Sequence, residues 1–283
     1  MGEGGVNMEI KRITKIIVHG GVFHADDTLC IALLRNLGCT ADVQRAFKVQ
    51  ENVEEGTLVL DIGGEYDGIS RFDHHQASCP VRENGVKYAA FGLLVKALGI
   101  CEEAGFETFD EQFASGIDAR DNGQFELLAK YPSPVGDTIN EFVPSWDDTR
   151  TMDEAFEEAV QFAQGILQRE FSRRRSAAKA RSIVLEAAEK AENRIVVLPQ
   201  FCPWQDALST RAEEFKAVVY PALRGGYNAQ VVPSKTVKRA FPLDWLSNKP
   251  REATFVHQAR FLCATSTEEE AIRLAAFVEE DDQ

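Results

Sequence analysis

The chain has 283 residues, a net charge of −14 and an apolar fraction of 44%. Such a length builds one large domain or two of ordinary size. The acidic balance repels polyanions at long range, which argues against a protein that tracks long duplexes. No apolar run reaches the roughly 18 residues that a membrane span needs.

The six cysteines are scattered along the chain without a Cys-x-x-Cys pair. This pattern is typical of reduced thiols in a cytoplasmic protein rather than of disulfides or a zinc knuckle. Residues 1–8 have neither a basic start nor an apolar core, so no signal peptide is expected.

The first half alternates short apolar strands with helices. Residues 15–18 predict a strand that ends at His19, and residues 27–38 predict a helix. Residues 57–60 predict a strand that ends at Asp61, and helices are expected over 86–99 and 111–120. This alternation indicates an α/β layer with a largely parallel sheet.

Prolines and a glycine interrupt regular structure between residues 131 and 150, and a long helix is expected from 152 to about 192. Strand-like runs follow at 194–198, 216–220, 229–232 and 254–257, then a helix at 268–277 and a solvated acidic tail at 279–282. We therefore expect an α/β domain (1–145), a linker with a connecting helix (146–192) and a smaller α/β domain (193–283). The ligand-type residues described next would form a metal-binding catalytic site in the first domain if the family resemblance given below holds, and that resemblance assigns substrate binding to the last domain.

Imidazole and carboxylate side chains gather at four points of the first half. The candidates are His19, His24, Asp26, Asp61, Asp73, His74, His75, Asp118 and Asp121. These ligand types suit Mn²⁺, Fe²⁺, Zn²⁺ or Mg²⁺. Ligands collect beyond the carboxyl ends of parallel strands, so His19 and Asp61 should lie side by side.

A site for two metals needs a bridging carboxylate, and Asp61, alone at a strand end, is the best candidate. Asp118 and Asp121 are three positions apart at a helix end, so either could reach the site, with Asp121 slightly favoured. Asp27 is expected to cap a helix.

Four ordered motifs resemble a known family. They are His19-x4-His24-x-Asp26, Asp61 after an apolar strand, Asp73-His74-His75, and Asp118-x-x-Asp121-Asn122-Gly123. Together they resemble the DHH phosphoesterase superfamily, and within it the MYG1 branch, also catalogued as UPF0160 or "metal-dependent protein hydrolase". Later segments such as Pro242-Leu243-Asp244-Trp245 and Phe255-Val256-His257 extend the resemblance over nearly the whole chain.

The resemblance implies a two-domain DHH-type architecture and a binuclear centre, with Mn²⁺ as the expected metal and Mg²⁺ as the alternative. His19, His24 and Asp61 would hold one ion; Asp26, Asp61, His74 and one of Asp118 or Asp121 would hold the other. His75 would contact a substrate phosphate, and Asp73 would orient a histidine. The implied activity is a 3′→5′ exonuclease acting on RNA or short oligonucleotides.

In the second half, His257 is expected to contact substrate. The family resembled here tends to carry glycines after this histidine, and residues 258–264 contain none, so Arg260 is expected to contact substrate through its side chain. Two alternatives stay open: hydrolysis of a small nucleotide or phosphoanhydride, and a metal-stabilised binding protein without turnover. A phosphoester is the expected partner, long duplexes and membranes are not, and a homodimer is compatible with the sequence.

Overall fold

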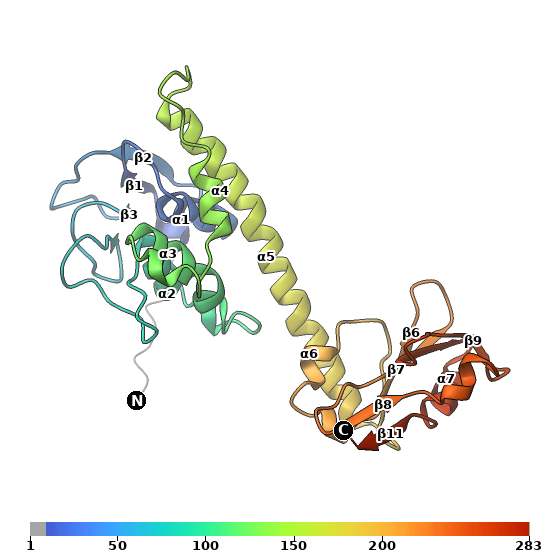
Figure 1. Cartoon of the computed structure of the whole chain (residues 1–283). Coiled ribbons are helices and arrows are strands. Elements are labelled where there is room, and N and C mark those ends of the chain that lie inside the picture. The colour runs from blue at the N-terminus through green and yellow to red at the C-terminus, as the bar shows by residue number, and fades with distance from the viewer. Residues whose placement is uncertain (1–9, 283) are drawn as a thin grey trace, which may run out of the picture. The chain divides into compact units, whose positions relative to one another are not determined.

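The computed structural model describes residues 10–282 and shows an α/β protein (Figure 1). The segment for which no signal peptide is expected lies outside the described residues. The chain divides within α5 (Met152–Glu189) into an N-terminal unit that ends at Arg175 and a C-terminal unit that begins at Ser176. The expected boundaries at 145 and 192 stay predictions. Within residues 10–282, no helix is both long and apolar enough to cross a membrane.

The N-terminal unit contains a parallel sheet in the order β2-β1-β3-β4, which confirms the predicted α/β class. The strands are β1 (Lys15–His19), β2 (Asp42–Ala46), β3 (Thr57–Leu60) and β4 (Arg71–Phe72). β1 alternates buried and half-buried side chains, whereas all four residues of β3 are buried. Strand β2 carries no apolar run and was not expected from the sequence.

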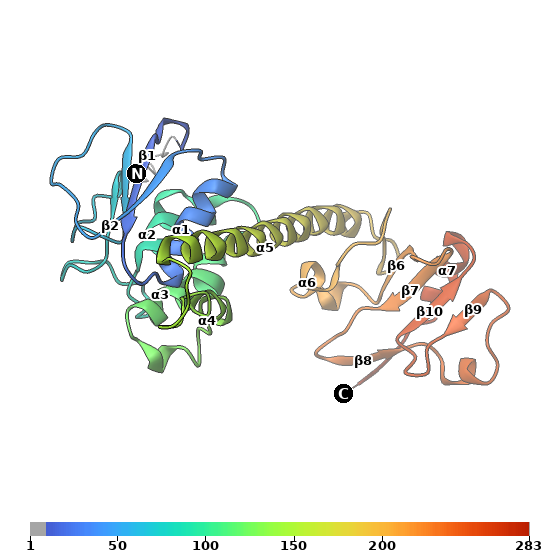
Figure 2. The ribbon, with the colours of Figure 1, turned by 90° about the horizontal axis from the view of Figure 1, so that it is seen from above.

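Helices lie beside this sheet (Figure 2). The α-helices are α1 (Ala25–Asn36), α2 (Ala90–Ala97), α3 (Ser115–Asp121) and α4 (Pro134–Asn140). The short helices are η1 (Ile10–Arg12), η2 (Ile100–Glu102), the π-helical η3 (Asp110–Ala114) and η4 (Phe125–Leu127). One core joins β1, β3, α1, α2 and the first half of α5, through side chains such as Val18, Leu29, Leu93 and Phe156.

The expectation that residues 131–150 lack regular structure is wrong for α4. Pro134 is the first residue of that helix, where its missing N–H is not needed and its fixed φ favours the helical turn. A proline in this position therefore starts a helix instead of breaking one.

The C-terminal unit contains a five-stranded sheet in the order β5-β6-β7-β10-β9, with β5 and β6 parallel and the other pairs antiparallel. Its strands are β5 (Ile195–Val197), β6 (Ala217–Pro221), β7 (Tyr227–Val231), β9 (Ala253–Val256) and β10 (Leu262–Thr265). A second ribbon pairs β8 (Val237–Ala240) with β11 (Glu279–Asp282). The helices are α6 (Gln205–Leu208), α7 (Glu268–Ala275), η5 (Ala212–Glu214) and η6 (Leu243–Leu246).

The two faces of this five-stranded sheet pack against different elements. Val219 and Ala229 belong to a core with α7. Val218 and Tyr220, which point to the other face, belong to a core with the last turns of α5. Among the described residues, the core on this second face joins α5 and α6 to β5, β6 and Val232, which directly follows β7, and includes no residue of β9 or β10.

The expected tail at 279–282 forms a strand, β11, although Glu279, Glu280 and Asp281 are exposed to solvent as expected. Glu280 pairs with Arg194 (2.6 Å) and with Arg239 (2.7 Å), whose side chain is 1% exposed. Four consecutive acidic residues have low strand propensity. Here the basic side chains of neighbouring segments compensate their charge, so the strand forms through tertiary contacts.

Replacing Glu280 by alanine should lower the stability of the C-terminal unit by about 1–3 kcal/mol, because the buried guanidinium of Arg239 loses a charged acceptor. Urea unfolding followed by the fluorescence of Trp204 and Trp245, both buried in this unit, measures the change. Replacing the exposed neighbour Asp281 by alanine is the control and should change stability by less than about 0.5 kcal/mol. Equal effects of the two substitutions would contradict the assignment.

Candidate metal centre

Two ligand-type residues lie at adjacent strand ends, as the parallel-sheet rule predicts. His19 is the last residue of β1 and Asp61 directly follows β3, its parallel neighbour. His19 Nδ1 lies 4.0 Å from Asp61 Oδ2. Asp61 has φ of 55°, in the left-handed region that aspartate and asparagine tolerate better than most residues. This conformation ends β3 and places a buried carboxylate at the sheet edge.

The turn between β1 and α1 adds two buried carboxylates. Asp26 and Asp27 lie in the first turn of α1, and both are fully buried. Asp27 Oδ1 accepts a hydrogen bond from the backbone N–H of His24 (3.1 Å), so the predicted capping contact is confirmed. Its other oxygen, Oδ2, has no hydrogen-bond partner among the described residues.

Asp73 holds His75 in a fixed orientation. Its carboxylate accepts hydrogen bonds from the backbone N–H groups of Gly64, His74 and His75, and His75 Nδ1 lies 2.6 Å from Asp73 Oδ1. Although burial opposes it, these bonds hold the pKa of Asp73 at about 2. The same contact raises the pKa of His75. The His75 side chain is 61% exposed, so Nε2 is accessible to a ligand.

The two ring nitrogens of His74 have different partners: Nδ1 faces Asn122, and Nε2 faces Asp121 and Asp61. Asn122 donates its amide hydrogens to the carbonyls of Tyr88 and Asp118, so its Oδ1, 3.3 Å from His74 Nδ1, acts as an acceptor. His74 Nε2 lies 2.9 Å from Asp121 Oδ2 and 3.2 Å from Asp61 Oδ1. Burial alone would lower the pKa of His74, but these two carboxylates raise it to about 10.

The two aspartates of α3 have different surroundings. Asp121 joins His74 and Asp26. Asp118 is fully buried, and its Oδ2 lies 2.7 Å from a guanidinium nitrogen of Arg82 while its Oδ1 accepts from the backbone N–H of Gly92 (3.2 Å). Burial, only partly offset by Arg82, raises the pKa of Asp118 to about 6. Arg82 was not predicted as a partner of Asp118, because its neighbours in the sequence form no recognisable motif.

The ligand atoms converge in four overlapping groups, each with all its atoms within 4.8 Å of one another. The groups are Asp61-Asp73-His74-His75, His19-Asp27-Asp61, His24-Asp26-Asp61 and Asp26-His74-Asp121. Asp61 belongs to three of them. The structure thus brings together the predicted residues of the first half except Asp118, and it adds Asp27.

The burial and the lack of hydrogen-bond partners of several carboxylate oxygens fit a site for divalent cations. Both carboxylate oxygens of Asp26, Oδ2 of Asp27 and Oδ1 of Asp61 are buried without a hydrogen-bond partner among the described residues. Burial and neighbouring carboxylates raise the pKa of Asp26 well above its usual range. Burial lowers the pKa of His19, which favours the neutral form that binds metal. Unpartnered anionic oxygens facing one another are stabilised by a cation.

The two predicted substrate contacts lie in the hairpin between β9 and β10. His257 Nδ1 accepts from the backbone N–H of Ala259 (3.0 Å), so Nε2 carries the hydrogen. Arg260 has φ of 57°, and its guanidinium donates to the carbonyl of Phe241 (2.8 Å). The guanidinium is therefore engaged with the main chain, and its contact with substrate stays a prediction.

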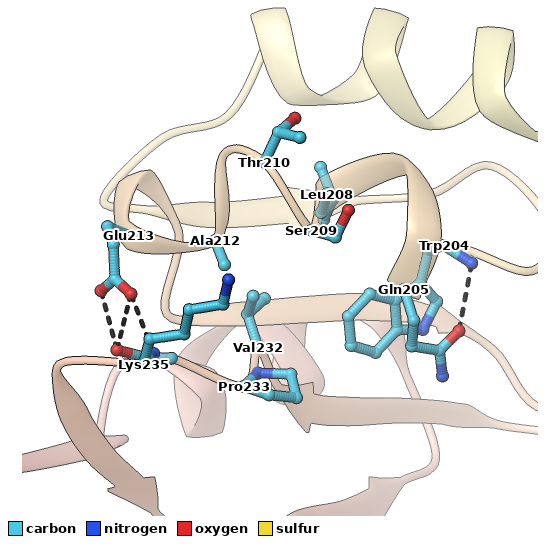
Figure 3. Close-up of a pocket in the computed structure, with 11 residues that line it drawn as sticks. Trp204, Gln205, Leu208, Ser209, Thr210, Ala212, Glu213, Val232, Pro233 and Lys235 are labelled. Atoms are coloured by element: carbon cyan, nitrogen blue, oxygen red, sulfur yellow. Dashed lines mark hydrogen bonds between the residues drawn. The ribbon is translucent and has the colours of Figure 1, made fainter. Parts of the chain in front are cut away.

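A cavity of about 590 Å³ in the C-terminal unit contains none of the predicted site residues (Figure 3). Trp204 and Val232 lie on its floor, and Lys235 extends across it. Glu213, at its rim, accepts hydrogen bonds from Ser234 and Thr236. This carboxylate holds the 234–236 turn.

The N-terminal unit is an α/β domain whose parallel sheet carries buried Asp and His side chains at its carboxyl edge. Such an arrangement could hold metal ions. The family model described as "Uncharacterised protein family (UPF0160)", MYG1_exonuc, matches residues 15–277, and the chain belongs to this family. The predicted MYG1 resemblance is thereby confirmed.

Two curated relatives align over most of their length. A MYG1 protein of Schizosaccharomyces pombe is 27% identical, with 94% of this chain and 97% of the relative covered. The MYG1 exonuclease of Mus musculus is 28% identical, with 92% and 83% covered. Among solved structures, a pGpG-specific phosphodiesterase from Vibrio cholerae matches with a TM-score of 0.34 at 12% identity, covering 92% of this chain and 96% of that one.

Proposed function

We propose that the chain is a metal-dependent hydrolase of phosphodiester bonds, acting as a 3′→5′ exonuclease on RNA or short oligonucleotides. The exonuclease names of the mammalian relatives support the enzyme class. The observation that carries the proposal is the convergence of buried carboxylate and imidazole atoms around Asp61, where oxygens of Asp26, Asp27 and Asp61 have no hydrogen-bond partner among the described residues.

The proposed centre holds two divalent ions, with Mn²⁺ as the expected metal. Its ligands would be His19, His24, Asp26, Asp27, Asp61, His74 and Asp121. Asp61 would be shared between the ions, and Asp118 would instead anchor α3 through Arg82. Bound ions of this kind supply Lewis acidity and a nucleophilic water at neutral pH.

The chain's own residues would position the substrate. Asp73 accepts the hydrogen on Nδ1 of His75 and raises the pKa of that ring; in the protonated ring Nε2 also carries a hydrogen, which would be donated to a phosphate oxygen. The exposed side of His75 gives a substrate access to that donor. With a net charge of −14, attraction for a polyanion has to be local, which favours a strand end or a short oligonucleotide over a long duplex.

The proposal is tested with purified protein loaded with Mn²⁺ and three substrates: the dinucleotide pApA, a longer RNA labelled at either end, and pyrophosphate. An exonuclease should shorten the labelled RNA from its 3′ end and cleave pApA. Faster hydrolysis of pyrophosphate would favour the small-phosphoanhydride alternative, which the acidic charge supports. If the protein binds metal normally but hydrolyses none of the three substrates, the result would favour the third hypothesis, a metal-stabilised binding protein without catalytic activity. A cytoplasmic location and a homodimer remain part of the proposal.

Replacing Asp73 by asparagine should lower kcat by about 10-fold to 100-fold, because His75 loses the anionic partner that fixes its proton. Initial rates on pApA at saturating Mn²⁺ measure the effect. Asp67→Asn is the matched control: Asp67 lies in the same segment, and within residues 10–282 its carboxylate accepts from Ile69, Ser70 and Arg71 but from no residue of the proposed site. An Asp73→Asn enzyme with the control's activity would remove Asp73 from the site.

A further inference from the structure

Over β9 and β10, one face of the C-terminal sheet packs against no helix among the described residues. Side chains that pair across neighbouring strands point to the same face. In the register of this sheet Phe255 pairs with Ala264, Ala264 with Asn228, and Asn228 with Tyr220. These four residues form a row across β9, β10, β7 and β6, on the face opposite α7, and the row ends at Tyr220, which lies under α5. Among the described residues, Phe255 and Ala264 belong to neither core of this unit.

The row leaves space for a flat group beside an aromatic ring. Phe255 is 51% exposed, and it lies next to Ala264, whose single methyl group fills little of the space before Asn228. A planar molecule seated over Ala264 would have the ring of Phe255 on one side and the amide of Asn228 on the other. Aromatic side chains on a sheet face stack on nucleobases in this way, largely without sequence preference.

Polar groups around this space have fixed orientations. The hydroxyl of Tyr220 donates to Gln230 Oε1 (2.7 Å). With Oε1 engaged, the amide nitrogen of Gln230 remains a donor, and base edges are rich in acceptors. His257 follows β9 with its hydrogen on Nε2, and its ring packs on Phe261 (4.2 Å between centroids). The face therefore offers one stacking ring and preset donors.

We propose that this face, defined by Asn228, Gln230, Phe255, His257 and Ala264, binds the bases of a single-stranded oligonucleotide. The inference rests on the proposed function and names its substrate as single-stranded nucleic acid recognised through its bases. Stacking of a base on an aromatic ring contributes to affinity without a basic side chain, which is compatible with the net charge of −14. Phe255 is the positioning residue in this proposal: its ring would stack on a base of an oligonucleotide, a contact that a phosphoester without a base cannot make.

Binding of a labelled phosphorothioate hexa-adenylate to the full Mn²⁺-loaded chain, followed by fluorescence anisotropy, tests the proposal. Phe255→Ala should weaken binding by about 10-fold to 100-fold, the loss expected for one stacked base. Phe255→Tyr should retain the affinity, and Phe255→Leu, which keeps apolar bulk without a π-face, should lose it. Phe277→Ala, which removes a ring of similar exposure (58%) outside this face, should have no effect.

An abasic oligomer of the same length and charge is the second probe. The wild-type chain should bind the abasic oligomer more weakly than hexa-adenylate. Phe255→Ala should bind the abasic oligomer with the same affinity as the wild type. Equal affinity of the wild type for both probes, or no change on Phe255→Ala, would overturn the proposal. Hydrolysis is measured separately: base-dependent binding without turnover would refute the proposed activity, and turnover indifferent to Phe255 would refute this inference alone.

Discussion

Asp61→Asn should reduce Mn²⁺-dependent hydrolysis about a thousandfold, since the loss of several kcal/mol of metal-based stabilisation corresponds to that factor in rate. Asp61 contributes to three of the four ligand groups, and its side chain is 2% exposed. Asparagine keeps the shape and tolerates the left-handed backbone at this position, so the fold should be preserved. The measurement is the initial rate on pApA.

Thermal unfolding separates this loss of function from a loss of structure. Without metal, Asp61→Asn should have a stability close to that of the wild type, because it relieves repulsion among facing carboxylates but also removes one of the two carboxylates paired with His74. Added Mn²⁺ should stabilise the wild type by about 2.7 kcal/mol at a hundredfold excess over Kd, and the variant by much less. An asparagine variant with wild-type activity and wild-type response to Mn²⁺ would exclude Asp61 from the centre.

Gly92→Ala should destabilise the N-terminal unit by about 3–5 kcal/mol, the cost of breaking a buried ion pair. A Cβ at Gly92, in α2, would overlap the carboxylate of Asp118 and the guanidinium of Arg82. Asp118 is fully buried, so its carboxylate cannot move into solvent. Since Asp121 lies one turn further along α3, the same substitution should also lower the activity.

Gly165→Ala is the matched control for this prediction. Gly165 lies within α5, and a Cβ there would meet only the far end of Arg169, at 3.1 Å. Alanine in a helix is normally more stable than glycine by about 0.5–1 kcal/mol, so the control should gain stability where Gly92→Ala loses it. Calorimetry and circular dichroism of both variants measure the difference. A stabilised Gly92→Ala protein would show that the Asp118–Arg82 pair does not hold α3.

The sequence predicted those parts of the site that follow from strand ends. His19 and Asp61 lie on neighbouring parallel strands, so their proximity follows from the order of the elements alone. The choice between Asp118 and Asp121 could not be made in this way. Both occupy the same helix, and what distinguishes them is Arg82, which is 36 positions away from Asp118 and has no marked motif.

The strands that consist of buried apolar residues were predictable from the sequence. The strands that consist of polar or charged residues were not. β1 and β3 are short apolar segments and were expected within one residue. β2 and β11 carry alternating or purely acidic sequences, and they form because a neighbouring strand supplies hydrogen bonds and, for Glu280, two arginines. Such strands depend on partners distant in the chain, which local sequence does not contain.

Two requirements, a hydrogen bond at the start of α1 and a charged oxygen in the ligand cluster, restrict which residue can occupy position 27. One of its oxygens holds the start of α1 and the other, buried without a partner among the described residues, faces His19 and Asp61. Asparagine would keep the first contact and lose the charge, and glutamate would keep the charge but extend its carboxylate by one carbon. If helix capping were the only task, either exchange would be tolerated. The combination leaves aspartate as the residue that satisfies both, so substitutions at position 27 should be as rare as those at the other proposed ligands.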